Sequence, residues 1–183
     1  MKLALAALLC LALAMAALPG LAEATEDGAF HEDSAPYQGQ WVPFEDGFRL
    51  YVPAQWQARS LTEAQSAAGL FYMMTNGGSD EAVGEVPMGL AVGYLDVGSM
   101  DDLNPLARDF ERSGHTDVHR LDLNGIPALS FRRVESNYRG VAFFHPSYPG
   151  YALLVYVTPC AAPGSAADGV ASALLASVSP AGD

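Results

Sequence analysis

The strongest constraint on the fold is a pair of predicted strands that flank Asn124-Gly125. Residues 118–123 and 126–134 contain Val, Leu, Ile and Phe, and Asn-Gly is the dipeptide that best suits a two-residue β-hairpin turn. A second pair of predicted strands, 139–145 and 151–158, is joined by a connection with Pro and Gly. Because hairpins join antiparallel strands, this half of the chain is predicted to form an antiparallel sheet.

Three further strands are predicted upstream, at 48–53, 70–75 and 88–94. A helix is expected after a cap at Ser99 or Asp102, ending near Gly114, and Pro105 leaves its start open. Either Asn104 is the cap and Pro105 the first helical residue, or the helix begins earlier and kinks. The pattern Ser165-x-x-Asp168 opens a terminal helix. The predicted fold is α+β, an α/β sandwich. It has an antiparallel sheet of about six to seven strands, a helix after the third strand and a C-terminal helix.

The first 24 residues have the pattern of a cleaved secretory signal. Lys2 precedes a run of Ala and Leu, and Ala22-Glu23-Ala24 supplies the small-x-small pattern that signal peptidase requires. The apolar run is short for a membrane-spanning helix. Cleavage after Ala24 is therefore predicted, with a secreted or extracytoplasmic mature chain.

Residues 25–40 are polar and acidic, which predicts a flexible leader before a single domain at 41–183. The formal net charge is −12, Lys2 is the sole lysine, and the other bases are all arginine. This acidity argues against nucleic acid and against anionic membrane surfaces as partners. Cys160 is the single cysteine after the predicted signal, so it is either an inert buried thiol or a site of intermolecular pairing or reactivity.

The order of elements and several landmarks resemble the PsbP-like superfamily. These landmarks are Phe48-Arg49-Leu50-Tyr51-Val52-Pro53 followed by Trp56, the helix after Gly98-Ser99, Leu123-Asn124-Gly125-Ile126-Pro127-Ala128, and Leu174-Leu175-Ala176-Ser177-Val178. The superfamily includes extrinsic photosystem II subunits, Ran-binding import factors and small bacterial envelope proteins. The resemblance implies a non-enzymatic adaptor or assembly role. It transfers no metal-binding or partner-contact residue to this chain.

A group of arginines is the best candidate for a partner-binding site. Arg132, Arg133, Tyr138 and Arg139 bracket a predicted hairpin tip in an otherwise acidic chain. Guanidinium groups suit carboxylates and phosphates, and Arg with Tyr is enriched at binding hot spots. The alternative is an ordinary solvated hairpin end. The loop at 76–87, rich in Gly and acids, is a second candidate for contact with a partner.

Other constellations point to chemistry less specifically. His115, Asp117 and His119 alternate and could share one face of a strand as zinc ligands, or they could form a polar helix-to-strand connection. The sequence contains no Gly-x-Ser-x-Gly motif and no phosphate-binding loop. The prediction is therefore an exported, non-enzymatic binding or assembly module with a protein partner and no cofactor. The alternatives are a small-molecule or metal-binding protein, or a secreted hydrolase.

Overall fold

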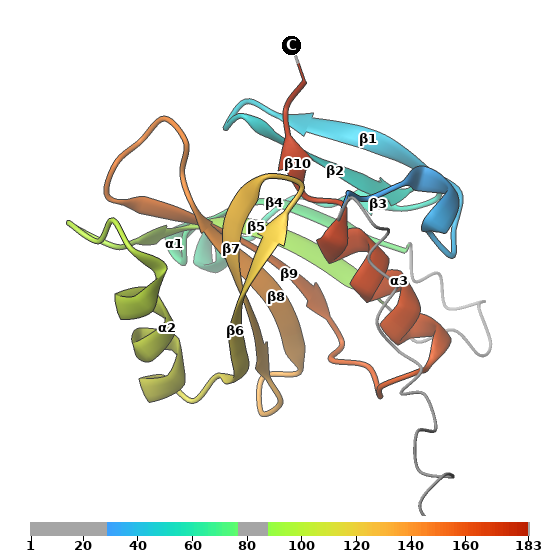
Figure 1. The fold of residues 1–183 in the computed structure, drawn as a ribbon. Coiled ribbons are helices and arrows are strands. Elements are labelled where there is room, and N and C mark those ends of the chain that lie inside the picture. Colours follow the sequence, from blue (N-terminus) through green and yellow to red (C-terminus); the bar gives the residue numbers. More distant parts are fainter. Residues whose placement is uncertain (1–28, 77–87, 183) are drawn as a thin grey trace, which may run out of the picture.

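The computed structural model describes residues 29–76 and 88–182, which form two antiparallel sheets and three α-helices (Figure 1). A seven-stranded sheet has the order β3-β4-β5-β9-β8-β7-β6, and a smaller one has the order β1-β2-β10. The strands of the large sheet are β3 (Gln57–Ala58), β4 (Leu70–Thr75), β5 (Gly89–Asp96), β6 (Thr116–Leu123), β7 (Ile126–Arg133), β8 (Tyr138–Phe144) and β9 (Tyr151–Thr158). The small sheet contains β1 (Gly39–Phe44), β2 (Phe48–Pro53) and β10 (Ser179–Pro180). The helices are α1 (Glu63–Ala67), α2 (Leu103–Arg112) and α3 (Ala166–Ala176), with a short 3-10 turn, η1 (Glu32–Ser34).

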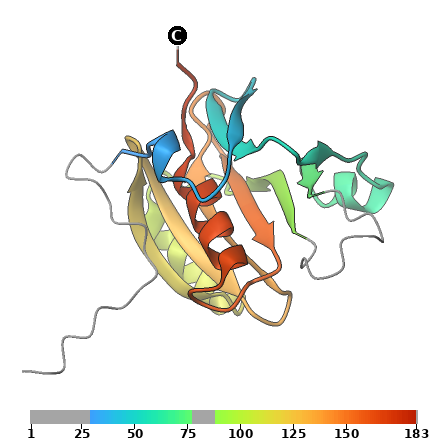
Figure 2. The same cartoon turned by 90° about the vertical axis from the view of Figure 1, so that its right-hand side faces the viewer.

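Both faces of the large sheet are covered, so the domain has a core on each side of it. Helix α2 lies on one face, where Phe110 packs with Phe131 and Ala142. Helix α3 and the small sheet lie on the other face (Figures 1 and 2). Successive residues of a strand point to opposite faces, so Val141 and Phe143 enter the second core while Ala142 enters the first.

Both predicted hairpins are present. β6 and β7 pair antiparallel around Asn124 and Gly125, whose φ angles of 53° and 91° are the left-handed values of a type I′ turn. β8 and β9 also pair antiparallel. The prediction of an α+β chain with an antiparallel sheet is therefore confirmed.

The predicted strand count and the assignment to one sheet were wrong. Strand 48–53 belongs to the small sheet, where it pairs with β1 and β10, and α2 follows the fifth strand rather than the third. The sequence did not predict β1, β3, β10 or α1. Two of these strands are only two residues long, and β1 begins inside the polar segment assigned to the leader. Two-residue strands contain too few residues to show a hydrophobic period in the sequence.

The helix ends follow the predicted capping chemistry. The side chain of Asp102 accepts a hydrogen bond from the Asn104 N–H, so the helix begins at Leu103, and Pro105 sits in the first turn, where its missing donor costs nothing. Gly114, with φ +84°, follows the C-cap. Ser165 caps α3 as predicted. None of the helices in the described ranges is long and apolar enough to cross a membrane.

Residues 29–40 lie against the domain, which differs from the predicted flexible leader. The Phe30 ring lies 6.0 Å from Trp41 and 5.8 Å from Tyr51, and Tyr37 stacks on Tyr51 at 5.8 Å. The Tyr37 hydroxyl donates to the Tyr51 carbonyl at 2.8 Å, and burial raises the pKa of Tyr37. Two aromatic side chains therefore anchor a segment that is polar on average. The predicted signal and its cleavage after Ala24 lie outside the described residues.

Asn124 ties the hairpin turn to two other segments, and its replacement should destabilise the domain. Its amide nitrogen donates to the carbonyls of Ala176 at 3.0 Å and Val178 at 2.7 Å, and its Oδ1 accepts from the Phe30 N–H. We expect Asn124→Ala to lower the free energy of unfolding by about 3 kcal/mol, from the lost hydrogen bonds and the left-handed backbone. Glycine adopts the left-handed backbone without strain, so Asn124→Gly should lower the free energy of unfolding by about 2 kcal/mol. Urea titration measures both, and a Gly variant as stable as the parent would mean that these bonds contribute nothing.

Candidate functional site

The β7–β8 hairpin separates the four predicted partner-binding residues into two pairs. Arg132 pairs with Arg139 across the strands, and Arg133 pairs with Tyr138. Because neighbours along a strand point to opposite faces, Arg132 and Arg139 face α3, whereas Arg133 and Tyr138 face the side of α2. The four residues thus lie close in the chain but belong to two different surfaces.

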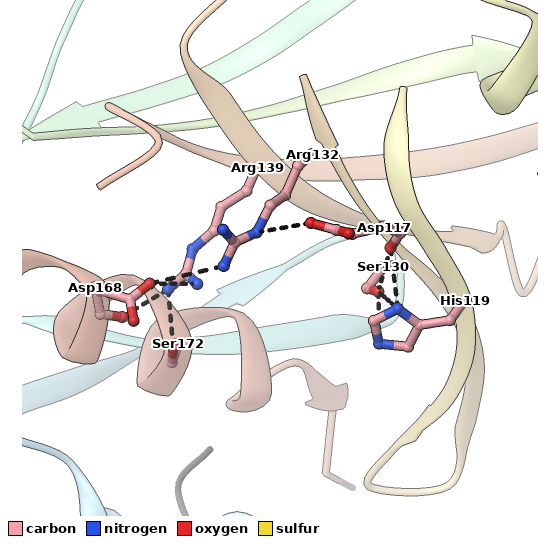
Figure 3. A network of polar contacts seen from close by, with 7 residues as sticks. All are labelled: Asp117, His119, Ser130, Arg132, Arg139, Asp168 and Ser172. Atoms are coloured by element: carbon pink, nitrogen blue, oxygen red, sulfur yellow. Dashed lines mark hydrogen bonds and ion pairs between the residues drawn. The ribbon is translucent and has the colours of Figure 1, made fainter. Parts of the chain in front are cut away.

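Arg139 is a buried structural residue. It is 8% exposed, and its Nη1 lies 2.8 Å from Asp168 Oδ1. Its Nη2 donates to the Asp168 carbonyl at 2.6 Å and to Ser172 Oγ at 2.8 Å (Figure 3). Burial lowers the pKa of Arg139 while the Asp168 carboxylate opposes that shift, and a guanidinium keeps its charge at neutral pH. This ion pair joins β8 to the first turn of α3.

Arg132 lies beside this pair, but its side chain is more exposed and its contacts with carboxylates are longer. Its side chain is 27% exposed, its Nε is 3.6 Å from Asp117 Oδ2, and its Nη2 is 3.9 Å from Asp168 Oδ1. Both separations exceed hydrogen-bond length, and the Arg132 side chain makes no hydrogen bond within residues 29–76 and 88–182. Two carboxylates therefore hold the guanidinium in place while its N–H donors stay available (Figure 3).

A pocket of about 370 Å³ opens between α3 and strands β6 to β8, next to Arg132. Its apolar wall includes Leu121, Val141 and Leu175, and Phe30 contributes from the N-terminal segment. We call this cavity the Arg132 pocket. An apolar wall beside a half-buried guanidinium suits a group that carries both a negative charge and some apolar surface.

Ser130 and His119 lie at the same pocket and are within hydrogen-bond distance of each other. The Ser130 Oγ is 2.9 Å from both ring nitrogens of His119, so it faces the ring edge between them rather than one lone pair. The His119 Nδ1 is also 2.9 Å from the Asp117 carbonyl oxygen. The pocket therefore holds a hydroxyl and an imidazole side by side, both of which are able to hydrogen-bond to a ligand.

The structure does not bring His115, Asp117 and His119 onto one face, so their interpretation as a zinc set was wrong. Asp117 has φ 52°, and the register between β6 and β7 shifts between Thr116 and His119. This bulge breaks the alternation, so that His115 bonds to Tyr138 on the α2 side and His119 bonds to Ser130 on the other. Within the described part of the chain, no three His, Cys, Asp or Glu residues are grouped to hold a metal ion.

Sequence reasoning missed Asp168 and Ser172 as partners of the arginines. Asp168 was recognised only as part of a helix cap, and it does accept a bond from the Gly164 N–H at Oδ2. The residues are 29 and 33 positions from Arg139, and no local pattern in the sequence links them. Of the other candidates, Cys160 is a half-buried free cysteine, and residues 77–87 of the predicted loop lie outside the described ranges.

No family model matches the chain, and no curated protein matches it in sequence. One similar solved structure is a crystal structure of a protein from Bacteroides thetaiotaomicron, determined at 1.50 Å resolution. The two chains are 12% identical, the match covers 80% of this chain and 50% of the other, and the TM-score is 0.43. A similarity this low carries no argument about fold or function, and the PsbP-like resemblance stays a prediction.

Proposed function

We propose that this protein is a non-enzymatic binding or assembly module that takes an acidic segment of a protein partner at the Arg132 pocket. The proposal rests on how the Arg132 guanidinium is positioned and on its free N–H donors. Its guanidinium is held between two carboxylates in a partly apolar cavity and makes no hydrogen bond within the described residues. Such an oriented donor set is preorganised for a carboxylate.

The partner's carboxylate would bind Arg132 by displacing the Asp117 carboxylate from it. The Asp117 side chain is 64% exposed and only in ion-pair range of Arg132, so this contact contributes little to stability. A carboxylate from the partner can take its place with bidentate hydrogen bonds, and Ser130 adds a hydroxyl at the same cavity. Asp168 cannot leave in this way because Arg139 holds it.

Two predictions from the sequence support the same role. The signal-like N-terminus predicts a mature chain at the cell envelope or outside the cell, where a protein partner would meet it. The PsbP-like resemblance implies an adaptor without catalysis. The net charge of −12 would repel acidic partners in general, and Asp117 and Asp122 also line the pocket, so selectivity would come from the local attraction to Arg132.

We expect Arg132→Met to reduce capture of this partner by at least about tenfold, because a charge-assisted hydrogen bond is lost. The measurement uses the full chain with a C-terminal tag, crosslinked in its own cells and culture fluid and quantified by mass spectrometry. Arg133→Met is the matched control, since it removes the same charge one residue away on the opposite face of the sheet. A synthetic acidic segment of the captured protein should compete, and more weakly as salt rises.

The proposal fails if capture by the Arg132→Met and Arg133→Met proteins is the same. It also fails if the captured protein's acidic segments do not compete for the full chain. The melting temperatures of both variants are measured alongside, so that a capture defect is not confused with unfolding.

A further inference from the structure

We propose that the α2 face of the large sheet carries a second binding site, which takes a small organic anion with an apolar body, such as a medium-chain carboxylate. This site is separate from the Arg132 pocket, because the sheet lies between them. It adds a small-molecule ligand to the protein partner proposed above.

The cavity lies among α2, the C-cap of α1 and strands β4, β5, β7, β8 and β9, and has a volume of about 430 Å³. This size is within the range of small-molecule sites, which are typically about 300–1,000 Å³. Its walls are mostly apolar and include Leu70, Leu95, Leu106, Phe131 and Leu154. A ligand that fills it must therefore bring an apolar body.

Polar groups gather where the cavity meets the β7–β8 hairpin. The His115 Nδ1 lies 3.1 Å from the Phe110 carbonyl, which can only accept, so this nitrogen carries the proton. The Nε2 then accepts from the Tyr138 hydroxyl at 2.9 Å. Arg133 also lines the cavity, and in the described ranges its side chain has neither an ion pair nor a hydrogen bond. One unpaired guanidinium beside an imidazole and a phenol provides complementary charge for an anionic head group.

The two acidic residues at the cavity do not neutralise this end. Asp96 pairs with Tyr151 at the far end of the β5–β9 ladder, whereas Arg133 pairs with Tyr138 at the opposite end of the sheet. Asp96 also accepts a bond from the Gly98 N–H. Asp109, on α2, is already ion-paired with Arg112. The ligand's head group is therefore directed to the Arg133 end and its apolar body toward α2 and β5.

His115 gives the site a dependence on pH. Burial lowers the pKa of His115, the hydrogen bond to the Phe110 carbonyl opposes that shift, and the positive charge of Arg133 adds to it. The other ionisable groups around it are Tyr138 of β8, Tyr156 of β9 and Asp109 of α2. A bound anion favours the imidazolium, so binding takes up a proton, and affinity should rise as the pH falls through the titration of His115.

Three probes with the same ten-carbon chain test the charge requirement: decanoate, decanol and decyltrimethylammonium. Titration calorimetry on the full-length protein, below micellar concentrations, should give decanoate the highest affinity and the cation the lowest. We expect Arg133→Met to lower the affinity for decanoate by about tenfold to a hundredfold and to leave the affinity for decanol almost unchanged. His115→Gln should flatten the pH dependence.

Arg132→Met is the matched control and should leave decanoate binding intact, just as Arg133→Met should leave partner capture intact. The proposal is overturned if decanoate does not bind the folded protein, or if the three probes bind equally. It is also overturned if Arg132→Met, rather than Arg133→Met, abolishes decanoate binding, since the ligand would then occupy the other pocket. Decanoate binding and partner capture are measured separately, so a failure of one proposal does not imply a failure of the other.

Discussion

Arg139→Ala is expected to lower the free energy of unfolding by about 3–5 kcal/mol, because it leaves Asp168 buried without its counter-charge. The variant also loses two hydrogen bonds that join β8 to α3. A domain of this size has a total stability of about 5–15 kcal/mol, so the loss is a large share of it. The melting temperature should fall by on the order of 10 °C.

Urea titration at neutral pH provides the measurement, and a double variant provides the control. Arg139→Met with Asp168→Asn removes both charges together, so it should recover part of the stability that Arg139→Ala loses. Arg132→Met should cost less than about 1 kcal/mol, since both of its ion pairs are long and its side chain is partly exposed. If Arg139→Ala were as stable as Arg132→Met, the Arg139–Asp168 pair would not stabilise the fold.

This difference changes how the arginine hairpin must be tested. In the sequence, Arg132, Arg133 and Arg139 form one basic group, and replacing all three together would be the obvious experiment. The structure shows Arg139 inside the domain, so that experiment would combine a loss of binding with a loss of folding. Single replacements of Arg132 and Arg133 separate the two faces.

The parts of the fold that were predicted correctly depend on local chemistry. The Asn124-Gly125 turn needs two left-handed residues, and Ser165 bonds to an N–H only three residues away. Both signals involve neighbours in the chain, so they are visible in the sequence.

The parts that could not be predicted depend on distant contacts or on a local exception. Phe30 anchors the N-terminal segment through ring contacts with Trp41 and Tyr51. A single aromatic residue does not show up in the average polarity of that segment. The bulge at Asp117 reverses the side on which His119 lies, and a strict period of two cannot anticipate it. The pairing of Arg139 with Asp168 requires α3 to lie on β8, which no pattern in either element specifies.

Two glycines should respond in opposite directions to the same substitution. At Gly140, in the middle of β8, an added Cβ would lie 2.4 Å from the Val155 carbonyl oxygen and 2.9 Å from the Phe131 ring. The first of these atoms is backbone, so β8 and β9 would have to separate, and we expect Gly140→Ala to cost about 3 kcal/mol. At Gly169, inside α3, the nearest atom is Pro36 Cγ at 3.9 Å, an ordinary contact.

Gly169→Ala should therefore stabilise the protein by about 0.5–1 kcal/mol, because alanine loses less backbone entropy than glycine in a helix. Urea midpoints of the two variants and the parent, measured together, should fall in the order Gly140→Ala, parent, Gly169→Ala. The added methyl group is the same in both variants, so only its surroundings differ. Equal midpoints for Gly140→Ala and the parent would mean that β8 and β9 do not approach as closely as the hairpin geometry requires. Both binding surfaces would then need to be reconsidered, since β8 contributes Arg139 to one and Tyr138 to the other.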